Sequence, residues 1–527
     1  MLVKSAADEL QNYLTDASNL QGGHAQKLFI PERADEIAEI IKEANETKTP
    51  LTISGARTGI VGGAVPFGGY IVSLEKFNRI KSIEKTENGG KAVVQAGVVL
   101  NDFQKEVESK GLFYPPDPTE WSCQIGGTIA TNASGSRSFK YGSTRGFVEG
   151  LTVVLPTGDI VNIKRGEAFA ANGEEIELKT GDGKSIRAKL PTYAQPRVRK
   201  NTSGYFTAEK LDAIDLFIGS EGTLGVVAEA HLKLLPQPEG FLSGIVFFKD
   251  ENDLLNFVRE ARNLSFETRK ARIQDSGFRI QDSGFRIQDS ESAILNPESG
   301  IPNSLDASLL EYFDAEALKF IKEKFAEVPD EMAGAIFFEQ ETNEKNEDAL
   351  FTQWNELLEK HGAEIDASWF TTTAKDREKM REFRHALPVS VNEWIVRHKQ
   401  RKVSTDIAVP DAEFASMLRF YKQSLAASNL QYVIFGHIGD CHLHVNILPK
   451  DAAEAMRAKH LYGRFIAQAI MLGGTISAEH GIGKIKSKYL YVQYGERYLN
   501  EMAELKRAFD PRGVLGRDNM FDAKFLG

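Results

Sequence analysis

Apolar residues recur at two spacings in the first half of the chain, and these spacings predict alternating helices and strands. Residues 34–46 carry isoleucines at the spacing of one helix face. Short apolar runs bounded by turn residues are typical of strands. We predict strands at residues 51–54, 70–74, 92–95, 151–155 and 159–163, the last two as a hairpin, and a second helix at 101–109.

Loop chemistry dominates residues 111–146, where glycine, serine, threonine and proline are frequent. The pattern then changes near the prolines of residues 236–238. Beyond this point strands are predicted at 243–248 and 334–339, two more strands around a turn within 432–448, and helices at 251–263, 348–361, 452–472 and 497–509. The chain is therefore expected to be of the α+β class.

A literal repeat interrupts the second half. The letters RIQDS occur three times, at residues 272–278, 279–285 and 286–290, within an insert that spans 272–292. Each copy has few apolar residues and a turn-like Asp-Ser-Gly, which argues against a coiled coil. We interpret the insert as a tandem duplication in an exposed loop, with a functional tail as the alternative.

Length and charge limit the protein class. A chain of 527 residues is too long for one core, so two or three domains are expected. The net charge of −10 argues against nucleic acid as the main partner. No apolar run is long enough to span a bilayer, and the N-terminus does not resemble a signal peptide. We expect a cytoplasmic protein and leave peripheral contact with the inner face of the membrane open.

The cysteine count also favours a cytoplasmic protein. Only Cys123 and Cys441 occur, and two thiols cannot build a disulfide scaffold or hold an iron–sulfur cluster. A reducing compartment therefore fits the sequence best.

A glycine-rich stretch follows the predicted strand at 51–54. Residues 54–64 read Ser-Gly-Ala-Arg-Thr-Gly-Ile-Val-Gly-Gly-Ala, so backbone amides can approach a pyrophosphate closely. No helix and no acidic ribose partner follow, which excludes the nicotinamide fingerprint. No Gly-Lys-Ser/Thr ends the stretch, which excludes a phosphate-loop NTPase. A plain glycine-rich turn is the alternative.

Further clusters of small residues favour a ligand over a plain turn. They lie at residues 114–118, 122–135, 140–142 and 219–226. Several such loops before one domain boundary indicate that backbone wraps around a large, flat, phosphorylated ligand. A dinucleotide fits this description.

These motifs, in this order, resemble the FAD-binding domain of the vanillyl-alcohol oxidase/para-cresol methylhydroxylase superfamily. The most similar branch is the D-lactate dehydrogenase, glycolate oxidase and D-2-hydroxyglutarate dehydrogenase group, and the resemblance covers residues 30–521 except the repeat insert. It implies a two-subdomain FAD-binding domain of the PCMH type at 1–238, an α+β cap (substrate) domain at 239–430, and a C-terminal region with the last helices at 431–527.

The resemblance also implies the FAD contacts. They are Gly55, Ala56, Arg57, Thr58, Gly59, Gly62, Gly63, Pro118, Ser122, Ile125, Gly126, Gly127, Thr128, Asn132, Ser134, Gly135, Tyr141, Gly142, Glu221, Gly222, Gly225 and Val226.

The first loop departs from the family pattern Arg-Gly-Ala-Gly-Thr. Ser54 and Arg57 replace the arginine and the second glycine, so Arg57 either adds charge to the pyrophosphate contact or points to solvent. No histidine lies in the flavin loops, where some relatives attach the isoalloxazine covalently. We therefore expect FAD to be held non-covalently.

A second constellation lies near the C-terminus. His437, His442 and His444 surround a turn, and His442 and His444 share one strand face by period two. Glu479 and His480 follow in a glycine-flanked segment. Two imidazoles and one carboxylate form a divalent-metal set with an open position, whereas isolated core or surface histidines are the alternative.

By the resemblance, His437, His444 and Glu479 fall at the family's metal ligands and His480 at its catalytic histidine. A divalent ion, zinc or manganese, is implied. Cys441 and His442 replace the Gly and Asn of the family pattern Gly-Asp-Gly-Asn-Leu-His. His442 is then either an additional ligand or a hydrogen-bond donor to the site, and Cys441 is expected to face away.

A substrate acid requires a cation, and arginine suits a carboxylate by bidentate pairing. Arg381 is the first candidate and Arg384 the second, each weighed against a solvated helix face. Ser404 stands where relatives that bind a larger diacid carry a lysine, with Lys402 as the nearby replacement. In the C-terminal signature Gly516-Arg517 replaces Asn-Pro, and no ferredoxin-like extension is expected.

The functional hypothesis is an FAD-dependent dehydrogenase that oxidises a small D-2-hydroxy acid, D-lactate first, to the 2-oxo acid. His480 is expected to be the general base and flavin N5 the hydride acceptor, with a quinone, a cytochrome or an electron-transfer flavoprotein taking the electrons. The alternatives are glycolate or another 2-hydroxy acid as substrate, a flavin-carrying electron-transfer subunit, and an iron oxygenase that would leave the first half without a role.

Overall fold

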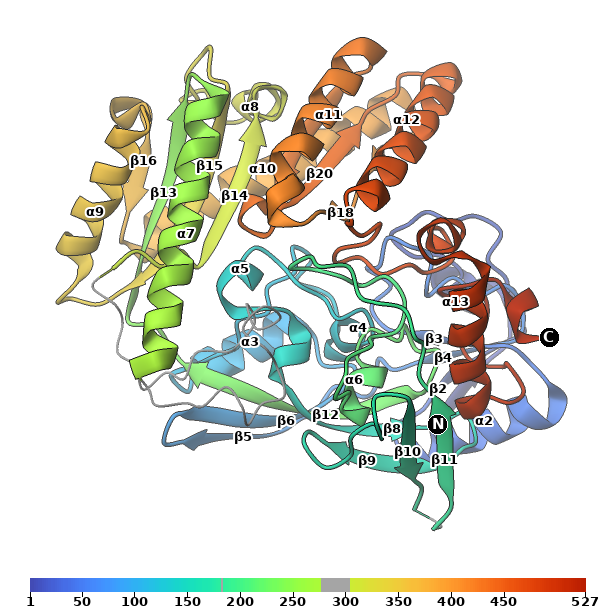
Figure 1. The fold of residues 1–527 in the computed structure, drawn as a ribbon. Helices are drawn as coiled ribbons and strands as arrows, with labels where there is room; N and C mark the ends of the chain where they lie inside the picture. The colour runs from blue at the N-terminus through green and yellow to red at the C-terminus, as the bar shows by residue number, and fades with distance from the viewer. Residues whose placement is uncertain (182, 276–303) are drawn as a thin grey trace.

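The computed structural model describes residues 1–181, 183–275 and 304–527. It mixes helices and sheets, as the predicted α+β class requires. Figure 1 shows two halves, with the cap sheet of the second half standing above the N-terminal half. Both chain ends lie on the N-terminal half.

The N-terminal half begins with a small mixed sheet. Its strands lie in the order β1 (Leu2–Lys4), β2 (Lys27–Ile30), β4 (Tyr70–Ser73) and β3 (Leu51–Ser54). β4 pairs in parallel with both β2 and β3, and it is buried along its whole length. Helix α2 (Ala34–Thr47) connects β2 to β3 and buries the isoleucines of its predicted apolar face. The short helix α1 (Ala7–Leu10) precedes β2.

A larger antiparallel sheet follows. Its order is β5 (Ile80–Thr86), β6 (Gly89–Gln95), β12 (Val226–Pro236), β8 (Val148–Val154) and β9 (Ile160–Lys164), with β7 (Leu112–Phe113) paired to β12. The predicted hairpin is confirmed, since β8 and β9 pair in antiparallel register. The remaining elements of this half are α3 (Leu100–Glu108), α6 (Ala213–Phe217) and the hairpin of β10 (Glu175–Lys179) and β11 (Ser185–Lys189).

The prediction of loop for residues 111–146 is wrong in part. Two short helices, α4 (Ile125–Ala130) and α5 (Ser138–Tyr141), interrupt it. Glycine opposes helix formation in α4, but Ile125 and Ile129 are fully buried on one face of that helix. Burial of these two side chains outweighs the weak intrinsic preference.

The cap is an antiparallel sheet. Its order is β16 (Trp369–Thr371), β13 (Gly240–Phe248), β15 (Gly334–Thr342), β14 (Leu309–Asp314), β19 (Tyr432–Gly436), β20 (His442–Ile447) and β17 (Val403–Ser404), with β18 (Ile407–Ala408) also paired to β20. Its helices are α7 (Glu251–Asp275), α8 (Ala315–Lys322), α9 (Glu347–Lys360), α10 (Ala374–His398), α11 (Phe414–Ser428) and α12 (Ala452–Met471).

Alternation along β13 builds two cores on the two faces of this sheet. Val246 and Phe248 join the main core with residues of α7 and α9, whereas Ile245 and Phe247 join a separate core with residues of α8 and α10. The two sides of the sheet are therefore both covered by helices, and α7 crosses in front of β13 and β15 in Figure 1.

The repeat insert is partly helical. Helix α7 continues to Asp275, so the expectation of a loop is wrong for residues 272–275. Arg272 is half-buried and pairs with Asp306 at 3.5 Å, which gives the helix end a partner. The other copies of the repeat lie outside the described residues.

The end of the chain returns to the N-terminal half (Figure 1). Helix α13 (Ser487–Phe509) has a break at Gly495, and the part after it matches the predicted helix at 497–509. Leu51 of β3 receives a hydrogen bond from Gly516 at 2.9 Å and donates one to Val514 at 2.8 Å. Residues 431–527 are therefore shared between the halves, and the segment between α12 and α13 passes along their junction.

Candidate active site

Three histidines converge at the junction of the halves. His442 and His444 are two positions apart on β20 and therefore share one face of the strand. His437 directly follows β19, and a short 3₁₀ turn, η6 (Ile438–Asp440), lies between it and β20. The ring centroids of His442 and His444 are 4.6 Å apart, and those of His437 and His444 are 5.5 Å apart. The structure thus brings together the three histidines whose spacing predicted a shared site.

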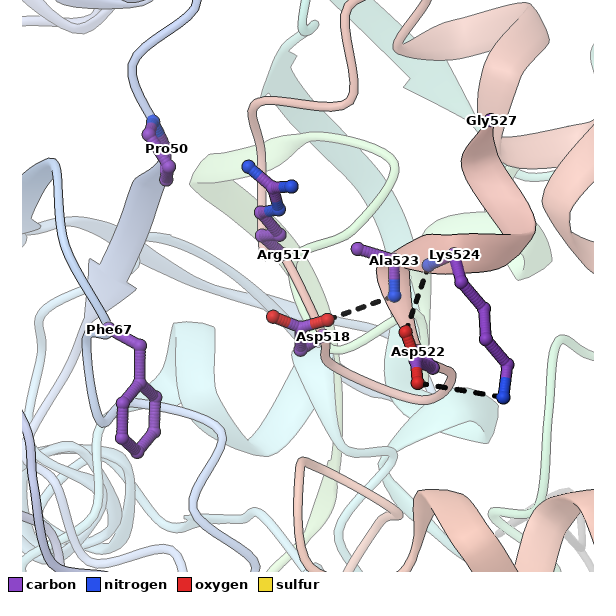
Figure 2. A pocket seen from close by; sticks show the side chains of 8 residues that line it. All are labelled: Pro50, Phe67, Arg517, Asp518, Asp522, Ala523, Lys524 and Gly527. Carbon is purple, nitrogen blue, oxygen red and sulfur yellow. Dashed lines mark hydrogen bonds and ion pairs between the residues drawn. The ribbon is translucent and has the colours of Figure 1, made fainter.

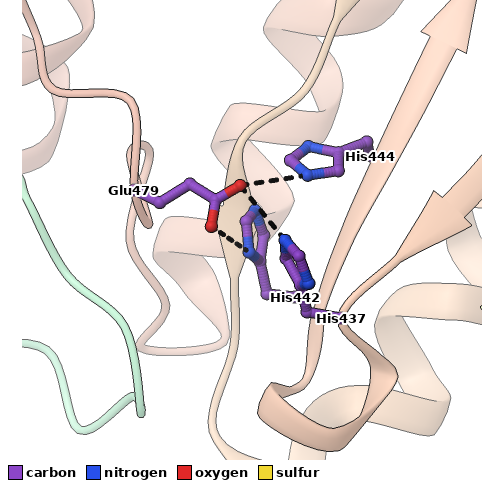
Figure 3. A group of neighbouring side chains, drawn as sticks. All are labelled: His437, His442, His444 and Glu479. Atoms are coloured by element: carbon purple, nitrogen blue, oxygen red, sulfur yellow. Dashed lines mark hydrogen bonds and ion pairs between the residues drawn. The ribbon is translucent and has the colours of Figure 1, made fainter. Parts of the chain in front are cut away.

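Glu479 lies at the centre of these rings (Figure 3). Its Oε1 is 3.3 Å from Nε2 of His437 and 3.2 Å from Nε2 of His444, and its Oε2 is 3.9 Å from Nδ1 of His442. One ligand atom from each of these four side chains lies within 4.8 Å of the others. Three imidazoles and one carboxylate at this spacing fit a divalent metal ion. We call these four residues the histidine cluster.

A buried carboxylate orients His437. Glu311 of β14 contacts Nδ1 of His437 through Oε1 and accepts a 3.0 Å hydrogen bond from Nε of Arg384 through Oε2. Burial opposes the charged form of Glu311, but His437 and Arg384 hold the pKa of this carboxyl well below its ordinary value. Burial also opposes the charged form of His437 and would by itself lower its pKa. The Glu311 carboxylate outweighs this effect, and the pKa of His437 is raised to about 9. An oxygen partner on the outer ring nitrogen is typical of metal-binding histidines.

The N-terminal half contributes two contacts to Glu479. Nζ of Lys200 and Oγ of Ser134 both lie 3.2 Å from its Oε2. Nζ of Lys200 is also 3.3 Å from Asp440, whose other oxygen is 3.0 Å from Nε of Arg199. The histidine cluster therefore depends on both halves of the molecule.

His480 is held beside this cluster by Asp406. Its Nδ1 lies 3.3 Å from Oδ2 of Asp406, and its Nε2 lies 3.6 Å from Oε1 of Glu479. The side chain of His480 is 25% exposed, whereas those of the three clustered histidines are at most 11% exposed. His480 is therefore more accessible than the three clustered histidines beside it.

Asp406 is itself firmly fixed. It accepts hydrogen bonds from Nζ of Lys486 at 2.6 Å, from Oγ of Ser477 at 2.8 Å, and from the amides of Glu479 and His480 at 3.2 and 3.0 Å. Burial would raise the pKa of this carboxyl, but His480 and Lys486 hold it well below the ordinary value. A charged, immobile carboxylate thus fixes the orientation of His480.

The first glycine-rich loop has the form expected for a phosphate cradle. No helix follows β3, and within the described residues none of the backbone amides of residues 56–64 donates a hydrogen bond to the protein. A Cβ added at Gly59 or at Gly127 of α4 would meet no described atom within 4 Å. Free amides and open space at glycines fit a phosphate ligand such as the pyrophosphate of FAD.

Other glycines of these loops are required by packing within the protein. An added Cβ would lie 1.8 Å from the Asp117 carbonyl oxygen at Gly135 and 2.7 Å from the Ala96 side chain at Gly126. An added Cβ at Gly225 would lie 2.5 Å from the side chain of Val153 in β8. These three positions shape the loops without needing a ligand.

Several predicted cofactor side chains have protein partners. The Arg57 guanidinium lies 4.5 Å from the centre of the Tyr13 ring and donates to the Gly55 carbonyl at 3.1 Å, so it turns toward the N-terminal segment. Ser134 contacts Glu479, as described above. Oδ1 of Asn132 accepts a 3.0 Å hydrogen bond from the Arg145 amide.

Glu221 joins the third cofactor loop to the catalytic segment. Its carboxylate accepts hydrogen bonds from the amides of Ile482 at 2.6 Å and Gly483 at 2.7 Å, directly after Glu479 and His480. The remaining predicted cofactor residues lie in the same loops or in the short helices and the strand that adjoin them: Ala56, Thr58, Gly62, Gly63, Pro118, Ser122, Ile125, Thr128, Tyr141, Gly142, Gly222 and Val226.

The two candidate arginines of α10 lie in different surroundings. Arg384 is linked to the histidine cluster through Glu311. Arg381 pairs with Glu378 at 3.5 Å and lines a separate cavity of about 250 Å³ that also contains Arg137 and Arg377. Only Arg384 of this pair belongs to the network around His437.

A cavity of about 500 Å³ lies elsewhere, between the loops around Pro50 and Phe67 and the C-terminal tail from Arg517 to Gly527 (Figure 2). Pro50 precedes β3, whereas the glycine-rich loop follows the other end of that strand. This cavity therefore lies at the opposite end of β3 from the start of the predicted phosphate cradle.

Sequence reasoning assigned no role to Glu311, Asp406 or Lys200. The two carboxylates carry a signal: Glu311 interrupts the apolar run Leu-Leu-Glu-Tyr-Phe, and Asp406 precedes an apolar strand. A charged residue in such a run is either exposed or paired when buried. Which partner it finds depends on tertiary contacts that the local pattern does not contain.

Comparisons with known proteins identify the family to which both halves of the chain are similar. A family model for the FAD binding domain matches residues 25–164, and a model for the C-terminal domain of FAD linked oxidases matches residues 287–520. The D-lactate dehydrogenase of Anaerostipes hadrus is 31% identical over 91% of this chain and 86% of its own length. The predicted FAD-binding domain of the PCMH type and its C-terminal partner are thereby confirmed.

Other relatives have related substrates in their names. The glycolate oxidase subunit GlcD of Bacillus subtilis is 29% identical over 97% of this chain and 92% of its own, and the D-2-hydroxyglutarate dehydrogenase of Stutzerimonas stutzeri is 28% identical over 99% and 96%. A solved structure of alkyldihydroxyacetonephosphate synthase shares the fold, with a TM-score of 0.64 at 15% identity over 98% of this chain and 81% of that one.

Among the described residues, no helix combines the length and apolarity that crossing a membrane requires.

Proposed function

The chain belongs to the family of FAD-linked oxidases, and on this basis we propose that it is an FAD-dependent dehydrogenase of a small D-2-hydroxy acid, with D-lactate as the first candidate. The observation that carries the proposal is the position of His480, which Asp406 orients and which lies beside the histidine cluster. One relative, 31% identical, is named a D-lactate dehydrogenase.

We assign cofactor binding to the N-terminal loops and metal binding to His437, His444 and Glu479. The free amides of residues 56–64 support the first assignment, and the spacing of the ligand atoms supports the second. When bound, FAD supplies a two-electron acceptor and a divalent ion, zinc or manganese, supplies a Lewis acid for the hydroxyl and carboxylate oxygens of the substrate.

His480 acts as the general base in this proposal. Asp406 faces Nδ1, so Nε2 is the nitrogen that is left to take the proton of the substrate hydroxyl. Asp406 remains charged and favours the protonated ring that results. The oxidation is balanced when this proton goes to His480 and the hydride on the substrate carbon goes to the flavin, which leaves the 2-oxo acid.

Arg384 is the better candidate for the substrate carboxylate. Glu311 holds its Nε, and Nη2 lies 3.4 Å from Oγ1 of Thr119, so the guanidinium is fixed close to His437. Nη1 has no acceptor among the described residues. Arg381 is half exposed and faces the separate cavity, which favours a role outside the substrate site.

Two parts of the assignment rest on the family alone. We propose that a quinone, a cytochrome or an electron-transfer flavoprotein accepts the electrons. We keep residues 1–238 as the FAD-binding region, 239–430 as the cap and 431–527 as the region that completes both. Glycolate is the second candidate substrate, because one relative is named a glycolate oxidase subunit.

A dye-linked assay with D- and L-lactate, glycolate and D-2-hydroxyglutarate tests the proposal. We expect turnover to be fastest with D-lactate and far faster than peroxide formation in air. Chelator-treated enzyme should keep its yellow colour and lose turnover until a divalent ion is added. Absence of dye reduction with all four acids would contradict the proposal.

A further inference from the structure

His442 has the same environment as the two histidines assigned to the metal. Each clustered ring directs one nitrogen to Glu479 and the other to an outer oxygen. That oxygen is Oε1 of Glu311 for His437 and the Thr405 carbonyl, at 3.3 Å, for His444. For His442 it is Oδ1 of Asp406, 3.1 Å from Nε2, while Nδ1 faces Oε2 of Glu479. The inner face of the cluster is therefore built from three equivalent imidazoles.

The protein leaves Nδ1 of His442 without a hydrogen bond. The side chain is fully buried, and within the described residues Nδ1 has no hydrogen-bond partner. Nε2 faces Oδ1 of Asp406 at 3.1 Å, as the outer nitrogens of His437 and His444 face their oxygen partners. A buried nitrogen with no partner is costly unless a ligand satisfies it.

We propose that His442 is a fourth protein ligand of the divalent ion, through Nδ1. The site then consists of three imidazoles and one carboxylate, in place of the two imidazoles and one carboxylate that the family pattern implies. The inference rests on the metal site of the proposed function. It concerns a residue that replaces the asparagine of the family pattern.

Four protein ligands change which metal the site can use. A tetrahedral ion such as zinc would have no open position for substrate unless it expanded its coordination. An ion that readily takes five or six ligands, such as manganese or cobalt, keeps positions open. The inference therefore favours manganese over zinc as the ion that supports turnover.

The test counts imidazole ligands directly. FAD-loaded enzyme is stripped with a chelator and reloaded with Co²⁺, and X-ray absorption at the cobalt edge is compared for wild type, His442→Asn, His437→Asn and the remote control His361→Asn. We expect three imidazoles in wild type and in the control and two in each cluster variant. A competition assay with a chromophoric chelator should show the Co²⁺ affinity of His442→Asn falling more than about 10-fold.

The possible failures are distinguishable. If wild type binds Co²⁺ through two imidazoles and His442→Asn does not change that number, His442 is not a ligand, although the proposed function stands. If wild type binds no Co²⁺ at all, the metal site of the proposed function is wrong as well. FAD content and the melting temperature identify a variant that fails to fold, and His442→Gln then replaces it under the same criteria.

Discussion

Oδ2 of Asp406 lies 3.3 Å from Nδ1 of His480, and this contact joins the cap sheet to the segment that carries the proposed base. Asp406 comes directly before β18, and His480 lies between α12 and α13. Because Asp406 is also bonded to Lys486 and to two amides of that segment, it positions the whole turn and not the ring alone.

Asp406→Asn should therefore slow the reaction without removing the cofactor. The amide keeps the shape but loses the charge that favours a protonated His480, so we expect kcat per bound flavin to fall about 10- to 100-fold with little rise in KM. The assay is made at saturating metal, because Asp406 also faces His442. Asp411→Asn, whose half-exposed carboxylate pairs with the buried Arg262, is the control and should keep its rate. A role in folding only would reduce FAD content and leave the rate per flavin unchanged.

Gly127 of α4 and Gly135 of the loop that follows should respond in opposite ways. The added Cβ of Gly127→Leu would have no described atom within 4 Å, so the apoprotein should melt no lower than wild type while FAD binding is lost. Gly135→Ala forces a methyl group to 1.8 Å from the Asp117 carbonyl oxygen and should cost about 1–3 kcal/mol of stability. Flavin fluorescence titration and thermal melting of the apoproteins separate the effects. Normal FAD affinity in Gly127→Leu would show that the space near this residue does not receive the cofactor.

The arginines of α10 can be compared by the same conservative change. Arg384→Lys keeps the charge but loses the fork geometry that pairs with a carboxylate, and we expect kcat/KM for D-lactate to fall about 10- to 100-fold. Arg381→Lys should remain within about twofold, because its side chain pairs with the exposed Glu378. Steady-state dye reduction measures both. A larger loss in Arg381→Lys would assign the substrate carboxylate to the cavity that contains Arg137 and Arg377.

Asp314 gives the stability of the protein a defined dependence on pH. Burial raises the pKa of this carboxyl to about 7, from about 3.9 in an unfolded chain. The folded protein therefore holds more protons between about pH 4 and pH 7, and the free energy of unfolding decreases as pH rises through that window. The Asp314 oxygen that caps α8 accepts from the Ala317 amide at 2.7 Å, and an asparagine oxygen can accept the same bond.

Asp314→Asn should thus match wild type near pH 4 and be more stable than wild type at pH 8. Urea denaturation of the FAD-loaded proteins at both pH values measures the difference. If Asp314→Asn differed from wild type by the same amount at both pH values, or were less stable than wild type at pH 8, Asp314 would titrate in its ordinary range.

The local sequence pattern predicted a feature correctly where the feature lies within a single element. The period-two placement of His442 and His444 put them on one face of β20, and the glycine-rich stretch after β3 was correctly expected to continue without a helix. Local pattern failed where packing decides. The weak helix former Ile-Gly-Gly-Thr-Ile-Ala folds as α4 because its isoleucines are buried.

The outer partners of the site could not be predicted for the same reason. Glu311 and Asp406 are single carboxylates in apolar surroundings, and their partners His437 and His480 lie 126 and 74 residues away in the chain. Nothing in the local sequence selects those partners. Similarly, Arg381 and Arg384 are three residues apart on one helix, and only their tertiary contacts separate the arginine of the site from the arginine of the neighbouring cavity.

The central claim is that His480 takes the hydroxyl proton of a D-2-hydroxy acid as the flavin is reduced. Metal-loaded wild type and His480→Asn are mixed with D-lactate without oxygen, and the loss of yellow flavin absorbance is followed in a single turnover. We predict that wild type bleaches and that His480→Asn retains FAD and metal but bleaches about 10²–10⁴-fold more slowly. Loss of metal in the variant would make His480 a ligand. A wild-type flavin that stays oxidised, or a variant that bleaches as fast as wild type, would contradict the claim.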